Sequence, residues 1–246
     1  MKKRLALLSA LSMVMLGATS AHAQNLLANG TLDVTYDQEI VPGFSLPKPA
    51  NWVNAGSRAI TGPYEDEMSS EPWAGPAPTP VTTGGVAGDD WGVFFKPFSG
   101  NATDGAATGH LYQDVPATVG ARYKLTGWAG AEANFLAQGA EIALEFLDGG
   151  GAVIPASEQV VNLLPTLTVN NGLSFNYKEY TASGIAPAGA VSVRSRASMI
   201  GAMANPAGGG QAFVVDDFSL TVVPEPATIG LLALGFFGLT TMRRRK

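Results

Sequence analysis

The feature that most restricts how this chain can fold is a succession of short apolar runs between residues 26 and 222. The runs are rich in Val, Phe, Tyr, Leu and Thr. Gly, Pro and Asn separate them at the spacing of β-sandwiches, and long helical periodicity is missing. Strands are expected over residues 26–34, 91–96, 110–115, 122–129, 141–148, 177–182, 191–197 and 213–222. The pattern predicts an all-β fold, an antiparallel β-sandwich.

Alternation is clearest over residues 141–147, where every second side chain would face the core. The core-facing residues would be Ile142, Leu144 and Phe146, and the solvent-facing residues Glu141 and Glu145. An amphipathic helix over 131–147 is the alternative. The dipeptide Asp148-Gly149 between apolar runs is a strong turn signal and favours a hairpin.

The N-terminal residues 1–23 have the three parts of a secretory signal peptide. The basic residues Lys2, Lys3 and Arg4 come first, an apolar stretch follows to about residue 18, and Ala21-His22-Ala23 closes it with a small-x-small pattern. Cleavage between Ala23 and Gln24 is expected. An uncleaved anchor is the alternative, but the apolar stretch is short for a span.

The C-terminal residues 223–246 form a second targeting segment. Pro224, Glu225 and Pro226 are followed by an uncharged apolar run over 227–242 and by the basic residues Arg243, Arg244, Arg245 and Lys246. As a helix, the run would span roughly 24 Å against a hydrocarbon core of about 30 Å, which predicts a short membrane helix. The basic end would stay cytoplasmic, which leaves residues 24–222 outside. A buried core helix with a solvated tail is the alternative.

This tail resembles the PEP-CTERM sorting signal of Gram-negative bacteria, in which a Pro-Glu-Pro motif precedes a short membrane segment and a basic end. The resemblance implies cleavage near the motif by an exosortase, a membrane protease. It also implies a transient stay in the inner membrane, followed by delivery to the cell surface or to extracellular material rich in exopolysaccharide, such as a biofilm.

Charge and rare residues exclude several functions for residues 24–222. The whole chain has 15 basic and 20 acidic residues, but seven of the basic ones and the acidic Glu225 lie in the targeting ends, so this domain carries a net charge of −11. Such a surface repels nucleic acid. Cysteine is absent, and cleavage would leave His110 as the one histidine. Thiol chemistry and zinc sites with several histidines are excluded, and a Ser-His-Asp triad would have to use His110.

A second resemblance covers most of residues 24–222. The opening Asn25–Asp33, together with Leu111–Val115, Leu144–Asp148 and Val215–Leu220, is similar in order to pieces of galactose-binding-like jelly rolls, including carbohydrate-binding modules. Leu32 and Asp33 depart from the usual Phe and Glu. The resemblance implies a structural calcium ion joining the first and last strands, with Asp33 and Asp217 as ligands and Asp216 as a further candidate.

A long segment rich in proline, residues 42–90, separates the first two expected strands and is interpreted as a binding loop or an insertion. Its aromatic residues Trp52, Tyr64 and Trp73 are candidates for a sugar-binding platform, because the C–H face of a pyranose is apolar. The competing interpretation packs Trp52 and Trp73 onto the sandwich. A carboxylate pair for glycoside hydrolysis is conceivable here, but the spacing does not define one.

The sequence thus predicts an exported, non-catalytic β-sandwich protein of the cell envelope that associates with exopolysaccharide. A matrix protein without a glycan ligand is the first alternative, and a polysaccharide-acting hydrolase is the second.

Overall fold

The computed structural model describes residues 24–57, 66–72, 91–167, 169–170 and 177–223. The predicted signal peptide and sorting tail lie outside these residues. Within the described part of the chain, no helix has the length and apolar character needed to cross a bilayer.

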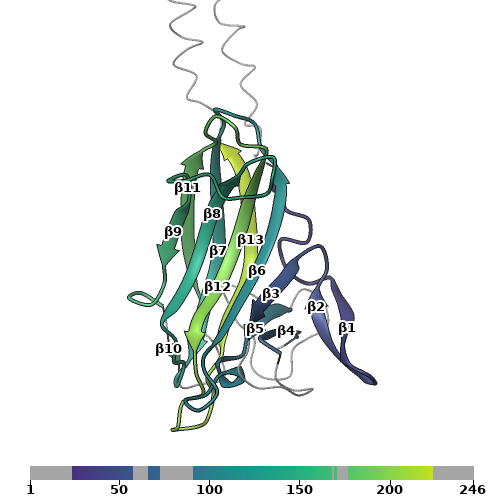
Figure 1. Cartoon of the computed structure of the whole chain (residues 1–246), viewed down its shortest axis with the longest axis vertical. Coiled ribbons are helices and arrows are strands. Elements are labelled where there is room, and N and C mark those ends of the chain that lie inside the picture. The colour runs from purple at the N-terminus through teal and green to yellow at the C-terminus, as the bar shows by residue number, and fades with distance from the viewer. Residues whose placement is uncertain (1–23, 58–65, 73–90, 168, 171–176, 224–246) are drawn as a thin grey trace, which may run out of the picture.

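The regular secondary structure of the described chain is almost all β-strand, which confirms the all-β prediction (Figure 1). The strands are β1 (Thr35–Val41), β2 (Phe44–Pro49), β3 (Val53–Ser57), β4 (Met68–Glu71), β5 (Gly92–Phe95), β6 (Ala107–Pro116), β7 (Arg122–Glu132), β8 (Gly139–Leu147), β9 (Gln159–Asn162), β10 (Val169–Asn170), β11 (Lys178–Ile185), β12 (Ser192–Ala202) and β13 (Phe213–Val223). A short 3₁₀ helix, Pro97–Ser99, follows β5.

Two larger sheets form the sandwich. One has the strand order β3-β6-β12-β8-β9, and the other has the order β10-β7-β13-β5-β4 with β11 also paired to β7. Strand pairing is antiparallel except between β10 and β7. A separate β1–β2 hairpin projects beside β3 and β4 (Figure 1).

The core lies between the two larger sheets and is filled by aliphatic and aromatic side chains. Fully buried members include Leu111, Leu125, Ile142, Leu144, Phe146, Phe213 and Val215. The alternation predicted for residues 141–147 is confirmed, because β8 places its three apolar side chains in this core. The predicted turn follows, with the Asp148 carboxylate accepting hydrogen bonds from the Gly150 and Ala152 amides at 2.8 and 3.0 Å.

The predicted strand over 26–34 is wrong, because this segment is a loop. Asn29 and Leu32 have positive φ angles of 52° and 62°, which extended chain does not allow. The Asn29 side chain holds the loop by accepting a hydrogen bond from the Val34 amide at 3.0 Å and donating to the Ala50 carbonyl at 2.9 Å. The first strand therefore begins only at Thr35.

The segment 42–90 is also more regular than predicted, since its described residues include β2, β3 and β4. This segment contains a buried lysine, Lys48, which is 1% exposed. The Lys48 ammonium donates to the Asp66 carboxylate and to the Met68 carbonyl, and so joins the hairpin to β4. Burial raises the pKa of Asp66, but hydrogen bonds with Glu67 and the charge of Lys48 outweigh that effect, so this pKa is lowered overall.

Trp52 closes one part of the core. Its side chain is 4% exposed, its ring lies 5.2 Å from that of Phe218, and its indole N–H donates to the Asn29 carbonyl at 2.9 Å. The loop before β1 is therefore anchored to β13 through one indole ring.

We predict that Trp52→Ala lowers the free energy of unfolding by about 3–5 kcal/mol, because it removes a buried aromatic ring and leaves the Asn29 carbonyl without this donor. Urea unfolding followed by tyrosine and tryptophan fluorescence measures the loss. Tyr36→Ala is the control, since Tyr36 is 45% exposed and should change stability little. Equal effects of the two substitutions would contradict the assignment of Trp52 to the core.

Candidate ligand-binding face

The outer face of the five-stranded sheet carries a continuous set of polar side chains. Cross-strand register places Arg194 of β12 between Asp114 of β6 and Glu145 of β8, and places Ser198 between His110 and Glu141. Because side chains alternate along a strand, these residues share the face opposite the core. We call this set, with Tyr112 and Arg196, the polar sheet face.

Arg194 and Tyr112 form a cation–π stack on this face. The guanidinium carbon lies 4.0 Å from the centre of the Tyr112 ring, and its Nε and NH2 atoms donate to the two oxygens of Asp114 at 2.7 and 2.8 Å. The hydrogen bond to Asp114 is the main cause of a raised Arg194 pKa. A bidentate pair fixes the plane of the guanidinium, so the ring and the cation are held together before any ligand arrives.

Arg196 clamps β12 to β8. Its Nε and NH2 atoms donate to one oxygen of Glu145 at 2.9 and 2.7 Å, and NH1 lies 3.3 Å from Glu141. Glu145 was expected to face solvent and does lie on the outer face, but it is only 5% exposed because Arg196 covers it. This pair is therefore a scaffold for the polar sheet face.

His110 lies at the centre of the same network, with Nδ1 2.7 Å from the Ser198 hydroxyl oxygen. Arg196 also donates a hydrogen bond to that hydroxyl oxygen, so Ser198 links the imidazole to the guanidinium. Burial, followed by the charge of Arg196, lowers the His110 pKa from its ordinary value of 6.5. His110 is therefore neutral at pH 7.

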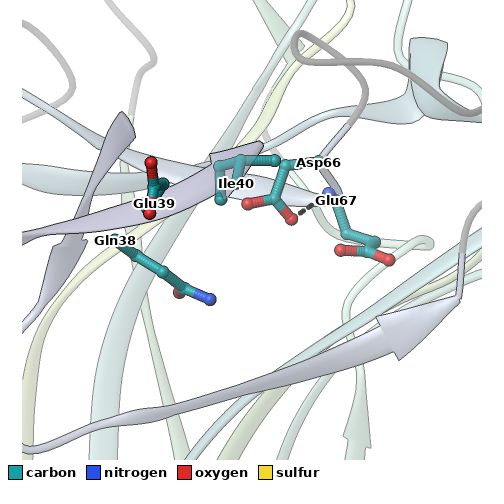
Figure 2. A pocket seen from close by; sticks show the side chains of 5 residues that line it. All are labelled: Gln38, Glu39, Ile40, Asp66 and Glu67. Atoms are coloured by element: carbon teal, nitrogen blue, oxygen red, sulfur yellow. Dashed lines mark hydrogen bonds between the residues drawn. The ribbon is translucent and has the colours of Figure 1, made fainter. Parts of the chain in front are cut away.

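A second polar site is a hollow of about 230 Å³ beside the hairpin, lined by Gln38, Glu39, Ile40, Asp66 and Glu67 (Figure 2). The Asp66 carboxylate accepts a hydrogen bond from the Glu67 amide at 2.7 Å, and Lys48 neutralises it from the interior. The hollow offers mainly acceptors. In the described chain, no group of three or more His, Asp or Glu side chains is arranged to hold a metal ion.

Of the three aromatic residues predicted to bind a sugar, one lies in the described part of the chain. Trp52 is buried, so the competing interpretation is correct for this residue and its ring faces are not available as a sugar platform. Tyr64 and Trp73 lie outside the described residues, as do Ala23, Pro224, Glu225 and Pro226 and the basic cluster. The expected first mature residue, Gln24, is exposed.

Asp33 and Asp217 are brought to one region near the start of β5. An Asp33 carboxylate oxygen accepts a hydrogen bond from the Trp91 amide at 3.2 Å. Asp217 has a positive φ of 48° at a bulge in β13, two residues beyond Val215, which pairs with Val93. The neighbouring Asp216 is 2% exposed and accepts from the Asp217 amide at 2.8 Å.

Sequence reasoning did not single out Tyr112, Arg194, Arg196 or Ser198. A usable signal was present, since residues 192–198 alternate as Ser-Val-Arg-Ser-Arg-Ala-Ser, with two arginines on one face of an expected strand. Arginines at alternate positions of a central strand require carboxylate partners on the neighbouring strands. That requirement points to the glutamates of 141–145.

Comparisons with known proteins match the C-terminal segment to a family model. Residues 222–246 match the PEP-CTERM protein-sorting motif, which confirms that prediction. A search of curated proteins returned no match.

Solved structures with a related fold have low sequence identity. The enzymatically active domain of tailspike protein 4 of bacteriophage CBA120 is 13% identical with a TM-score of 0.44, covering 71% of this chain but only 20% of the tailspike chain. The module TmCBM61, solved with β-1,4-galactotriose, is 17% identical with a TM-score of 0.45, covering 82% of this chain and all of the module (100%). A CBM4 structure is 15% identical with a TM-score of 0.40 and covers 80% and 99%.

The lowered pKa of His110 makes stability depend on pH. As pH falls below 6.5, the imidazole of the unfolded chain binds a proton before the imidazole of the folded protein does. The contribution of neutral His110 to the free energy of unfolding is therefore complete above pH 6.5 and is lost as pH falls towards the folded pKa. We predict a smaller loss of unfolding free energy between about pH 7.5 and about pH 5.5 in His110→Gln than in the wild type. Urea titrations at both pH values measure it. An unchanged pH dependence would contradict the buried, neutral imidazole.

Proposed function

We propose that this is an exported, non-catalytic glycan-binding protein of the cell envelope, with the polar sheet face as its binding site. The observation that carries the proposal is the Arg194–Tyr112 stack, held in plane by Asp114 at 2.7 and 2.8 Å. Such a stack offers a flat surface to the C–H face of a sugar ring, and the surrounding polar groups offer partners for its hydroxyls.

The charges of this face favour a neutral glycan. Its two guanidiniums lie against three carboxylates, those of Asp114, Glu141 and Glu145, and His110 is neutral at pH 7. An anionic sugar would compete with carboxylates that already occupy the arginines. Exposed aliphatic side chains border the face, with Val53 46% and Val160 43% exposed on the flanking strands β3 and β9.

Delivery is the second part of the proposal. The sorting motif at 222–246 supports export with a C-terminal membrane signal. We propose that residues 227–242 enter the inner membrane, that an exosortase cleaves near Pro224–Pro226, and that the domain then remains at the cell surface or joins exopolysaccharide in a biofilm.

The absence of catalysis is likewise proposed. The pair His110–Ser198 has the residue types of a base and a nucleophile, but Ser198 is fully buried and its hydroxyl is engaged by Arg196. A nucleophile must reach its substrate, so this pair is interpreted as part of the scaffold.

We predict that Tyr112→Ala lowers affinity for the best glycan on a neutral-polysaccharide array by roughly two- to tenfold, because one stacked ring contributes roughly 0.5–1.5 kcal/mol. Tyr36→Ala is the matched control, since this exposed tyrosine lies on the hairpin and not on the polar sheet face. Both variants are first compared with the wild type by thermal unfolding.

Three outcomes would count against the proposal. Wild-type binding that survives Tyr112→Ala unchanged would move the site elsewhere, with the hollow at Glu39 and Glu67 as the next candidate. No binding to any glycan would favour a matrix protein that acts through bulk and charge. Hydrolysis of an array polysaccharide would favour the enzyme alternative.

A structural calcium ion held by Asp33 and Asp217 remains a separate proposal. The two residues lie near the start of β5, but carboxylates there already accept amide hydrogen bonds, so backbone carbonyls would have to complete six to eight ligands. We predict that calcium raises Tm by several degrees over EGTA, and that Asp217→Asn removes this shift. The same Tm in calcium and in EGTA would overturn the proposal.

A further inference from the structure

One end of the sandwich differs from the rest of its surface. At this end β6 and β11 finish and β7 and β12 begin, and the described chain stops there at Val223, the second residue of the matched sorting segment 222–246 (Figure 1). The loops 117–121 and 186–191 form its surface. We call this region, with Ile185, Arg122 and Val222, the tail-proximal end.

The tail-proximal end exposes four aliphatic side chains. Val191 is 56% exposed, Val119 54%, Ile185 51% and Val222 39%. Single exposed aliphatic residues are common on soluble proteins, but four that gather around one end require an explanation.

The loops that carry these side chains are held in place. The Gly120 amide donates to the Ala186 carbonyl at 2.8 Å, and the Ala186 amide donates to the Ala121 carbonyl at 2.9 Å. The Val191 amide donates to the Leu147 carbonyl at 2.8 Å, and the Val191 carbonyl accepts from Ala117 at 2.9 Å. The exposed aliphatic residues therefore belong to a fixed surface.

Basic side chains accompany the aliphatic ones. Arg122 is exposed and pairs with Ile185 on one side and Val223 on the other, and the exposed Lys124 lies between Ser183 and Thr221. The domain as a whole is acidic, whereas this end has two exposed cations against the nearby carboxylate of Asp148. The nearby Asp148 carboxylate is engaged in its own turn.

The sequence after Val223 indicates what this surface faces. Only residues 224–226 separate Val223 from the apolar run that begins at Ala227. Four Cα steps reach at most about 14 Å, so a run that enters a bilayer would hold the tail-proximal end against that bilayer. Apolar tips bordered by cations are the pattern of surfaces that bind the interface of an anionic membrane.

We propose that the tail-proximal end docks on an anionic phospholipid bilayer while the sorting tail is attached. Val119 and Val191 enter the headgroup region, and Arg122 and Lys124 contact lipid phosphates. This inference rests on the proposed membrane insertion of residues 227–242.

The test uses the full chain, which has no cysteine and so accepts single labels. Val119→Cys and Leu136→Cys are labelled with an environment-sensitive fluorophore and reconstituted into phosphatidylcholine vesicles with and without phosphatidylglycerol. Leu136 is the matched control, because it is 42% exposed and lies in the turn between β7 and β8 at the opposite end. Lipid-borne nitroxide quenches only a label that touches the bilayer.

We expect quenching at position 119, stronger in the vesicles with phosphatidylglycerol, and none at position 136. Arg122→Glu with Lys124→Glu should lower the ratio of docked to undocked protein roughly fivefold for each cation removed. Thermal unfolding of each labelled variant confirms that it remains folded.

Flotation of the vesicles separates the two proposals. Protein that floats with the vesicles while neither label is quenched overturns the docking and leaves the membrane anchor intact; this end would then be open to a protein partner. Protein that does not float overturns the anchor, and the docking with it.

Discussion

The sandwich depends on the attachment of its first residues to its last strand. The Asn25 side chain donates to the Phe218 carbonyl and accepts from the Leu220 amide, both at 2.9 Å, and the Phe218 amide donates to the Gly30 carbonyl at 2.7 Å. A Cβ at Gly30 would lie 2.3 Å from the Phe218 oxygen, so only glycine permits this approach. In a chain without disulfides, these contacts fasten the ends of the domain to each other, and β13 in turn carries β7 and β5.

Two ion pairs with little exposed surface connect neighbouring strands. Lys48 and Asp66 join the hairpin to β4, and Arg196 and Glu145 join two strands of the other sheet, with little of either pair exposed. Removing one partner of a buried pair leaves an uncompensated charge, which is costly. Loss of one partner from either pair would therefore destabilise the fold, and Arg194 with Tyr112 is left as the more accessible part of the network.

Sequence reasoning located the strands whose pattern is local and missed what depends on distant contacts. Residues 141–147 alternate clearly, so the strand and its core face were predictable. Residues 26–34 also contain several leucines, but Asn29 and Leu32 have positive φ angles, and the Asn29 side chain bonds to residues 34 and 50. Trp52 was predicted as a possible platform because a lone tryptophan does not reveal its partners Phe218 and Asn29. The polar sheet face was missed for the same reason, since Arg196 and Glu145 are 51 positions apart.

The two proposed surfaces are compatible because they occupy different parts of the sandwich. The polar sheet face follows the strands β6, β12 and β8 along the side of the molecule, whereas the tail-proximal end lies where these strands begin or finish (Figure 1). If the domain rests on its tail-proximal end, the polar sheet face stands roughly perpendicular to the plane of the bilayer. A polysaccharide chain running outward from the cell could then bind along the strands without displacing the domain from the membrane.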